Sequence, residues 1–355
     1  MTSNGLEGVV VADTAISEVD GEAGRLVIAG SEVEDLAGGY EAVAARVIAA
    51  GGGSLDVAAL GRARVDAFEL LPRLGDALDA PDGMAALRTG LSHLGVADDP
   101  VALIGAAPVL VAAWSRRRTG AAPIPPDPAA THAADYLRMT TGGGGTPAQI
   151  AALDAYLVTA IDHGMSASTF TARVIASTAS DLTSAIVGAI GALRGPLHGG
   201  APGPVLDMLD AIGAPASAEA WLLAELAAGR RIMGMGHRVY RVRDPRAAVL
   251  ERAVERLQAS GLRSSRLALA RAVEAVAVAS LGEQHPERRL AANVEFYTAV
   301  ILDAVGLPQA LFAATFAVAR VAGWLAHVDE QLATGRLIRP ASRYIGPLPG
   351  DRVAA

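Results

Sequence analysis

The feature that most constrains this fold is a long, mostly apolar segment, QALFAATFAVARVAGWLAHVDEQL at residues 309–332. Its pattern predicts one long helix with Arg320 in its middle. No acidic residue lies three or four positions from Arg320 on either side. Because burying an unpaired charge is very costly, this guanidinium needs a partner from elsewhere. Two interpretations stay open, a distant structural acid or a bound carboxylate held by two hydrogen bonds.

The composition favours a mainly helical fold around that segment. Hydrophobic residues make up 52% of the 355-residue chain, but aromatic residues only 4%. The apolar mass is therefore Ala, Val and Leu, which suits closely packed helices better than a β-sandwich. Alternating apolar and turn residues over 5–30 predict short strands, the only β structure that we expect.

The net charge and the absence of cysteine exclude several classes of function. A net charge of −7, without a basic stripe, argues against a nucleic-acid partner. The absence of Cys excludes disulfides and thiolate metal sites. The N-terminus has no basic stretch like that of a signal peptide, and the longest uncharged apolar run, 101–114, is too short to span a bilayer. We therefore expect a cytoplasmic protein with no membrane partner. The sequence contains no Lys and is rich in Ala, which indicates a bacterial genome of high GC content.

Two glycine-rich turns each contain one histidine. The first, GPLHGGAPGP at 195–204, contains His198, and the second, MGMGHRVYRVRDPRA at 233–247, contains His237. Glycine lets backbone approach a ligand closely, and each turn is followed by Pro and an amphipathic run that predicts a helix. One such histidine alone usually lies in a surface loop. Two in one chain favour a ligand site.

The position of each histidine before a helix predicts its charge state. The positive end of the helix dipole disfavours an imidazolium, so a neutral ring can donate a hydrogen bond to a carbonyl. For His198 the helix begins near Pro202. Asp244 and Pro245 predict the N-cap and first residue of the next helix, 246–257.

Three further residues are candidates from the residues alone. Arg246 falls in a first helical turn, where a cation is electrostatically misplaced, so it is either a surface residue or part of an anion site. His163 precedes a helix predicted within 162–193, with Ser166 and Ser168 as candidate N-caps, and is either a capping or core histidine or a ligand. Glu295 stands at the start of an apolar helix, where a carboxylate usually complements the dipole.

These motifs resemble those of a known family. GPLHGGA and GMGHRVYRVRDPRA are similar to the two histidine motifs of citrate synthase. Further similar segments follow in the family's order and spacing, at 162–173, 293–297, 319–331 and 339–346, so the resemblance covers nearly the whole chain. Two departures stand out: Glu295 replaces the family's Asp in NVDFY, and Ser166 replaces an Asn.

The resemblance implies a mainly α, two-domain citrate synthase-like fold with a short N-terminal β segment, assembled as a homodimer. A large domain, 1–200 completed by 309–355, would face a small domain, 201–308, across a cleft that holds the active site. Closure of the cleft on substrate is the conformational step that we expect.

The resemblance also implies the site residues. The catalytic residues would be His198, His237 and Glu295. Oxaloacetate would be bound by His163, Arg246, Arg320 and the partner subunit's Arg339. Coenzyme A would contact Met233, Gly234, Met235 and Gly236. No cofactor and no metal is implied, because the acyl-CoA is a substrate.

The implied reaction condenses acetyl-CoA with oxaloacetate and hydrolyses the thioester to citrate and CoA. One alternative is 2-methylcitrate synthase, since propionyl differs from acetyl by a methylene worth only about 1–3 kcal/mol of discrimination. Another is a weakly active or non-catalytic paralogue that binds CoA or dicarboxylates. The longer Glu295 moves its carboxylate by about 1.5 Å, and a misplacement near 1 Å costs on the order of 100-fold in rate, so we expect an active but slower enzyme.

Overall fold

The small N-terminal sheet is as the alternating pattern predicts. The computed structural model describes residues 5–6, 8–94, 99–199, 202–237, 239–261, 266–284 and 291–347. Strands β1 (Ser17–Asp20), β2 (Arg25–Ile28) and β3 (Ser31–Glu32) form an antiparallel sheet in that order. The Asp20 carboxylate accepts hydrogen bonds from two backbone N–H groups in the β1–β2 turn, which closes a tight hairpin.

Helices make up most of the rest of the described chain. The α-helices are α1 (Gly39–Ala50), α2 (Leu60–Glu69), α3 (Gly83–Leu94), α4 (Pro100–Arg118), α5 (His132–Thr141), α6 (Pro147–Thr159), α7 (Ala167–Ala176), α8 (Leu182–Leu193), α9 (Pro202–Ile212), α10 (Ala218–Ala227), α11 (Pro245–Ala259), α12 (Arg266–Gln284), α13 (Val294–Ala304) and α14 (Phe312–Thr334). Short 3₁₀ turns cover Val33–Asp35, Val57–Ala59, Leu71–Asp79, Pro215–Ser217 and Gln309–Leu311. The prediction of a mainly α fold is confirmed.

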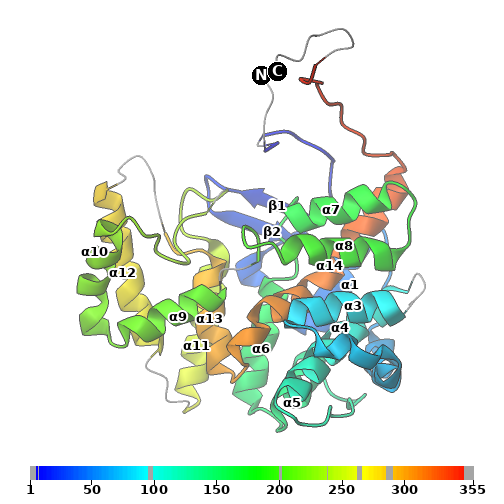
Figure 1. Ribbon diagram of the computed structural model, residues 1–355, viewed down its shortest axis with the longest axis horizontal. Coiled ribbons are helices and arrows are strands. Elements are labelled where there is room, and N and C mark those ends of the chain that lie inside the picture. Colours follow the sequence, from blue (N-terminus) through cyan, green and yellow to red (C-terminus); the bar gives the residue numbers. More distant parts are fainter. Residues whose placement is uncertain are drawn as a thin grey trace.

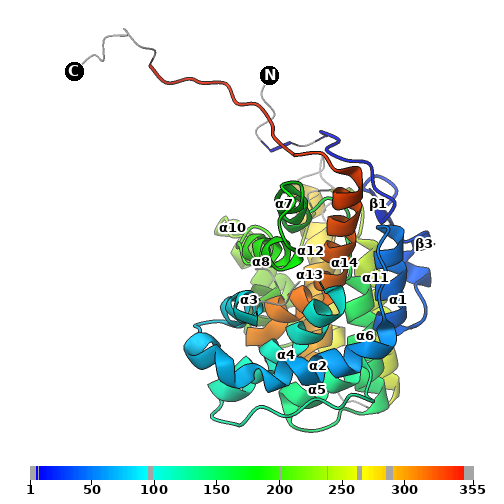
Figure 2. The same ribbon diagram turned by 90° about the vertical axis from the view of Figure 1, so that its right-hand side faces the viewer.

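Helix α14 is the centre of the larger group of helices (Figure 1, Figure 2). Its residues 314–328 are all buried, and α1, α4, α7 and α8 pack around it. The span Gln309–Thr334 is long and apolar enough to cross a membrane, but 94% of its most apolar window is buried within the protein. The predicted long helix is therefore the core helix of this fold.

Glycine permits two close approaches to α14. A Cβ added at Gly323 would lie 2.2 Å from the carbonyl oxygen of Ile161, and one at Gly51 would lie 2.2 Å from that of Ala326. Backbone atoms cannot retreat as a side chain tip can, so these positions exclude larger residues. The first contact fixes the α6–α7 loop, which carries His163, against the core helix.

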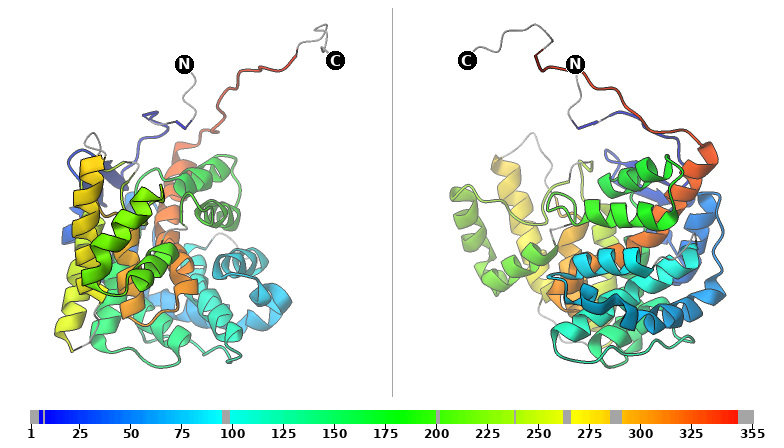
Figure 3. Two further views of the ribbon diagram at one scale, coloured as in Figure 1. Left: turned by 60° about the vertical axis from the view of Figure 1, so that its left-hand side comes forward. Right: turned by 45° about the vertical axis from the view of Figure 1, so that its right-hand side comes forward.

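Helices α9 to α13 lie together on one side of the molecule (Figure 1, Figure 3). Helix α13 packs on α9 and α11, and α10 packs on α12. The group is joined to the helices around α14 mainly through α11 and α13, which both contact α6. Helices α11 and α13 therefore lie at the boundary between the two groups.

One proline lies inside a helix, and one expectation about a helix boundary is wrong. Pro108 does not break α4, which runs through it with residues 103–115 buried. Tight packing of α2 on α4, at Gly105, offsets the roughly 3 kcal/mol cost of an internal proline. Residues 162–193 form two helices, not one. Ala179 adopts a left-handed φ of 61°, and Asp181 starts α8 by accepting a hydrogen bond from the Ser184 N–H.

The segment after α14 leaves the helical body as an extended chain (Figure 2). Residues 339–347 are exposed, including Tyr344 and Ile345, whose side chains are 69% and 87% exposed. Arg339 lies on this segment.

We predict that Gly323→Ala destabilises the protein by about 1–3 kcal/mol, because its methyl group would overlap the Ile161 carbonyl. The free energy of unfolding from urea titration measures the effect. Gly282→Ala is the matched control, since Gly282 also lies in a helix but has no atom within 4 Å of the added Cβ. Equal stability of the two variants would show that the close approach to α14 is not real.

Candidate active site

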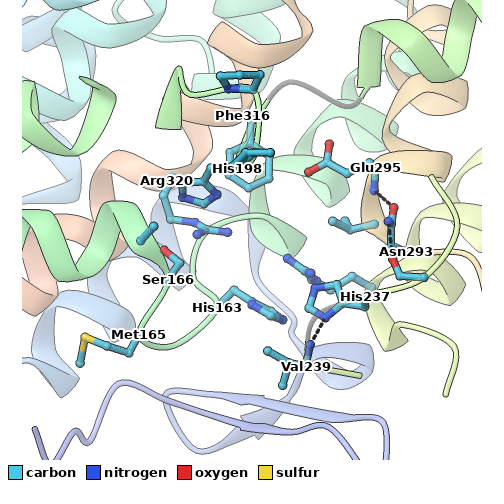
Figure 4. Close-up of a pocket in the computed structure, with 16 residues that line it drawn as sticks. His163, Met165, Ser166, His198, His237, Val239, Asn293, Glu295, Phe316 and Arg320 are labelled. Atoms are coloured by element: carbon cyan, nitrogen blue, oxygen red, sulfur yellow. Dashed lines mark hydrogen bonds between the residues drawn. The ribbon is translucent and has the colours of Figure 1, made fainter. Parts of the chain in front are cut away.

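A cavity of about 550 Å³ lies where six segments meet. Its lining comes from the α6–α7 loop, the turn at 196–198, the segment that carries Gly236, His237 and Val239, the start of α11, the start of α13, and α14. Figure 4 shows Glu295 and His237 on one side of it, facing His198 and Arg320 on the other. The cavity thus gathers polar groups that are far apart in the sequence.

His237 is held as a neutral hydrogen-bond donor. Its Nδ1 accepts from the backbone N–H groups of Val239, at 3.0 Å, and Tyr240, at 3.1 Å (Figure 4). A nitrogen that accepts carries no proton, so the proton of the neutral ring is on Nε2. Burial, together with the charge of Arg246, lowers the pKa of His237 to about 4. The neutral ring therefore predominates at pH 7.

His198 is held in the opposite tautomer. Its Nε2 lies 3.3 Å from the Ser168 backbone nitrogen and 2.8 Å from the Ser168 Oγ. The Trp324 indole N–H donates to that same Oγ at 3.1 Å, and the Ser168 backbone N–H donates to Nε2. Since Nε2 accepts, the ring proton is on Nδ1. The N–H that contacts the ring lies in the first turn of α7, whereas the sequence suggests the helix that begins at Pro202.

A short backbone pairing ties Glu295 to the His237 turn. Residues 234–236 pair antiparallel with 291–293 through a bridge between Met235 and Ala292. Asn293 then caps α13 by accepting from the Glu295 N–H, and its side-chain amide donates to the Gly236 carbonyl at 2.8 Å. The start of α13 and the turn before His237 are therefore held as one unit.

The negative charge of the Glu295 carboxylate is only partly compensated by neighbouring groups. Its Oε2 is buried and has no hydrogen-bond partner among the described residues. Burial raises the pKa of Glu295 to about 7, although the charge of Arg246 opposes the shift. A carboxylate with a pKa near the working pH is suited to act as a general base.

Arg246 is a buried half of an ion pair, so the interpretation as a surface residue is wrong. The Asp244 carboxylate receives two hydrogen bonds from its guanidinium, at 3.0 and 2.8 Å. Asp244 also caps α11 and accepts from the Val294 N–H at the start of α13. This pair therefore joins the two helix N-termini beside the cavity.

Arg320 differs, because no described carboxylate lies within 4.0 Å of it. Its Nε donates to the Ala160 carbonyl at 2.7 Å, and its guanidinium lies 4.7 Å from the centre of the Phe316 ring. Its Nη2 is buried without a partner among the described residues. Burial lowers the pKa of Arg320 to about 10, opposed by the charge of Asp162, so the group stays charged at neutral pH. A cation in this setting favours an anionic ligand.

His163 completes the cavity from the α6–α7 loop. Its Nε2 lies 3.1 Å from the Tyr240 hydroxyl, and its ring centre lies 5.4 Å from that of His237. Burial, and then the charge of Arg246, hold the pKa of His163 well below its usual value. The His163 ring is therefore neutral, as are the neighbouring rings of His237 and Tyr240.

The structure brings most of the predicted site residues together. The cavity is lined by His163, His198, Gly236, His237, Arg246, Glu295 and Arg320. Met233, Gly234 and Met235 are not among its lining residues, and a Cβ added at Gly234 would lie 2.9 Å from Phe296. Arg339 lines a separate groove between the N- and C-terminal segments.

Sequence reasoning overlooked the residues that hold the predicted ones in place. Tyr240 contacts both His163 and His237, and Asn293 links Glu295 to the His237 turn. An Asn directly before an apolar helix is an N-cap signal that was available. For Tyr240 the sequence offered only its place within the motif.

Comparison with known proteins agrees with this geometry. The sequence profile described as the citrate synthase C-terminal domain matches residues 5–341. A putative citrate synthase 2 of Mycobacterium tuberculosis is 41% identical over 97% of this chain and 93% of its own length. The citrate synthase of Deinococcus radiodurans is 35% identical over 97% and 96%.

Solved structures show the same fold. The crystal structure of citrate synthase from Thermotoga maritima superposes with a TM-score of 0.85 at 34% identity, covering 99% of this chain and 98% of that one. A Thermoplasma acidophilum citrate synthase, solved as a ternary complex with carboxymethyl coenzyme A and oxaloacetate, gives 0.88 at 26% identity over 99% and 98%. The chain belongs to the citrate synthase family.

We predict that Glu295→Gln stabilises the protein in a pH-dependent way. The pKa is about 7 in the folded protein against an ordinary value of 4.5. The folded state thus binds the proton more tightly, and the parent loses stability as the pH rises from about 4.5 to 7. Allowing for the part of the side chain that faces the cavity, the gain is about 2–3 kcal/mol at pH 8 and under about 1 kcal/mol at pH 5. Urea titrations at both pH values measure it; an equal effect at both would contradict the raised pKa.

Proposed function

We propose that this protein condenses acetyl-CoA with oxaloacetate and hydrolyses the resulting thioester to citrate and CoA. One observation carries the proposal. Two neutral imidazoles in fixed, opposite tautomers share a cavity with a carboxylate oxygen and a guanidinium nitrogen that have no described partner. Proton removal from a weak carbon acid needs a desolvated base and an aligned donor together, and a dianionic substrate needs fixed cations.

Oxaloacetate occupies the side of the cavity near His163 and His237. Arg320 pairs with one carboxylate, which satisfies its buried Nη2, and Arg246 contributes a second positive charge while Asp244 keeps it in place. The Nε2–H of His237 donates to the ketone oxygen. This bond strengthens as negative charge develops there, so it stabilises the transition state more than the bound substrate.

Acetyl-CoA is activated between Glu295 and His198. The Glu295 carboxylate removes a proton from the methyl group, and the electron pair moves to the thioester oxygen, where the Nδ1–H of His198 stabilises it. The enolate carbon then attacks the ketone carbon to form citryl-CoA. Water hydrolyses the thioester to citrate and CoA. The segment Met233, Gly234, Met235 and Gly236 is the proposed contact for the CoA chain.

The chain is proposed to act as two domains, 1–200 with 309–355 and 201–308. Support comes from the origin of the lining, because His198 and Arg320 belong to the first set of residues while His237 and Glu295 belong to the second. Substrate binding between the sets favours closure, which excludes water from the enolate.

A homodimer is proposed in which the partner subunit's Arg339 completes each oxaloacetate site. Within one subunit this arginine lies on the exposed C-terminal segment and lines a different groove of about 570 Å³. The exposed Tyr344 and Ile345 give that segment an apolar surface for a second subunit to cover.

We predict that the protein releases free thiol from acetyl-CoA only when oxaloacetate is present. A thiol-reactive dye measures this, and comparison with propionyl-CoA assigns the acyl preference. Glu295→Ala should lower kcat by about 100- to 10,000-fold, because the base is removed. Citrate formation by that variant at near-parental rate would show that Glu295 is not the base, and no thiol release by the parent would favour a non-catalytic paralogue.

We predict that subunits carrying Arg339→Ala and Glu295→Ala complement each other. Each variant alone should lose about 100-fold or more in kcat/KM, in the first case because a charge pair to substrate is lost. In a purified hybrid dimer with differently tagged subunits, one site carries both substitutions and the other neither. Such a hybrid should recover up to half of the parental activity. An inactive hybrid would place Arg339 in the site of its own subunit.

A further inference from the structure

The β1–β2 hairpin touches both segments that carry the oxaloacetate-side histidines. At its tip, the Gly21 carbonyl accepts a hydrogen bond from the Arg241 N–H at 2.8 Å. A Cβ added at Gly21 would lie 2.3 Å from the carbonyl oxygen of Val239. The hairpin tip and the segment 239–241 are thus in backbone contact, with no room for a side chain between them.

The base of the same hairpin holds the α6–α7 loop. The Ser17 hydroxyl donates to the Asp162 carboxylate, and both accept from the Gly164 N–H at 3.0 Å. A Cβ on Gly164 would lie 3.1 Å from a methyl group of Val19. His163, between Asp162 and Gly164, is therefore positioned by strand β1.

Tyr240 joins the two segments directly. Its backbone N–H donates to His237 Nδ1 at 3.1 Å, and its hydroxyl lies 3.1 Å from His163 Nε2. Its ring is buried and lies 4.8 Å from the His237 ring and 5.5 Å from the His163 ring, centre to centre. The bond to His163 spans 77 residues of sequence and crosses between the two helix groups.

We propose that Tyr240, supported by the β1–β2 hairpin, is a positioning residue that sets the spacing and orientation of His163 and His237 for the keto-dicarboxylate substrate. The inference rests on the proposed function for the identity of that ligand. Tyr240 does not line the cavity, so it acts through the two imidazoles. Without its hydroxyl, the His163 ring is free to rotate away from the ligand and His163 Nε2 loses its partner.

The main test is Tyr240→Phe in the full-length protein, which keeps the ring and removes the hydroxyl. The Kd for oxaloacetate, from isothermal titration, should rise about five- to tenfold, as loss of one neutral hydrogen bond predicts. The KM for acetyl-CoA at saturating oxaloacetate and kcat should change less than threefold, because the variant keeps the backbone N–H that holds His237 and leaves His198 and Glu295 untouched. Tyr136→Phe is the matched control, since its buried hydroxyl bonds to Thr315 at 2.8 Å away from the cavity.

A second pair of variants tests the hairpin. Gly21→Ala should weaken oxaloacetate binding in the same direction, because its methyl group displaces the 239–241 segment. Gly143→Ala is its control, with no atom within 4 Å of the added Cβ, and neither glycine has a left-handed φ. A folded Tyr240→Phe protein that binds oxaloacetate within twofold of the parent would overturn the proposal.

A ligand-free measurement separates this proposal from the proposed function. In the ¹⁵N-labelled protein, Tyr240→Phe should shift the imidazole nitrogen resonances of His163, and Tyr136→Phe should not. Unshifted resonances would refute the Tyr240–His163 contact even in an active enzyme. If the parent releases no thiol but the resonances shift, the proposed reaction fails while the positioning role of Tyr240 stands.

Discussion

Burial of titratable and charged groups around one cavity is the physical constraint on which this site depends. Desolvation is the first cause of the pKa shifts of His163, His237, Glu295 and Arg320. It keeps the imidazoles neutral, which makes them donors instead of cations, and it keeps a carboxyl group close to its titration point at neutral pH. The same loss of water makes unpaired polar atoms costly. The site is therefore stable only to the extent that the fold around it is rigid.

Rigidity comes from interactions that serve two segments at once. Asp244 caps α11, accepts from the start of α13 and neutralises Arg246. Ser168 supplies both a backbone and a side-chain contact to His198 while it accepts from Trp324 of α14. Asp244 thus stabilises a helix terminus and a functional side chain together, and Ser168 links His198 to the core helix, so stability and site geometry cannot be varied independently there.

Local sequence signals predicted much of this arrangement. Asp244 before Pro245 marks the start of α11, and the apolar run around Arg320 marks the core helix. The order of the motifs indicated the protein family, and the resemblance to that family predicted that His198, His237 and Glu295 share one site. The structure brings these three residues to one cavity. These predictions succeed because helix caps and apolar periodicity depend only on residues a few positions apart in the sequence.

Contacts between distant segments were not predictable in the same way. Nothing near Tyr240 indicates a bond to a histidine 77 positions earlier. The division of 162–193 into α7 and α8 depends on one left-handed residue, Ala179, a conformation that alanine rarely adopts. Pro108 stays within α4 because it is buried where α4 packs against its neighbouring helices, and that tertiary contribution outweighs the local preference.

The pairing of residues 234–236 with 291–293 has a mechanical consequence. It joins Glu295 and His237 through a single short ladder of backbone bonds, so these two side chains keep a fixed separation. His198 and Arg320 are instead attached to α7 and α14. In the proposed closure of the two domains, a small rotation therefore changes the distance from Glu295 to His198 but not the distance from Glu295 to His237.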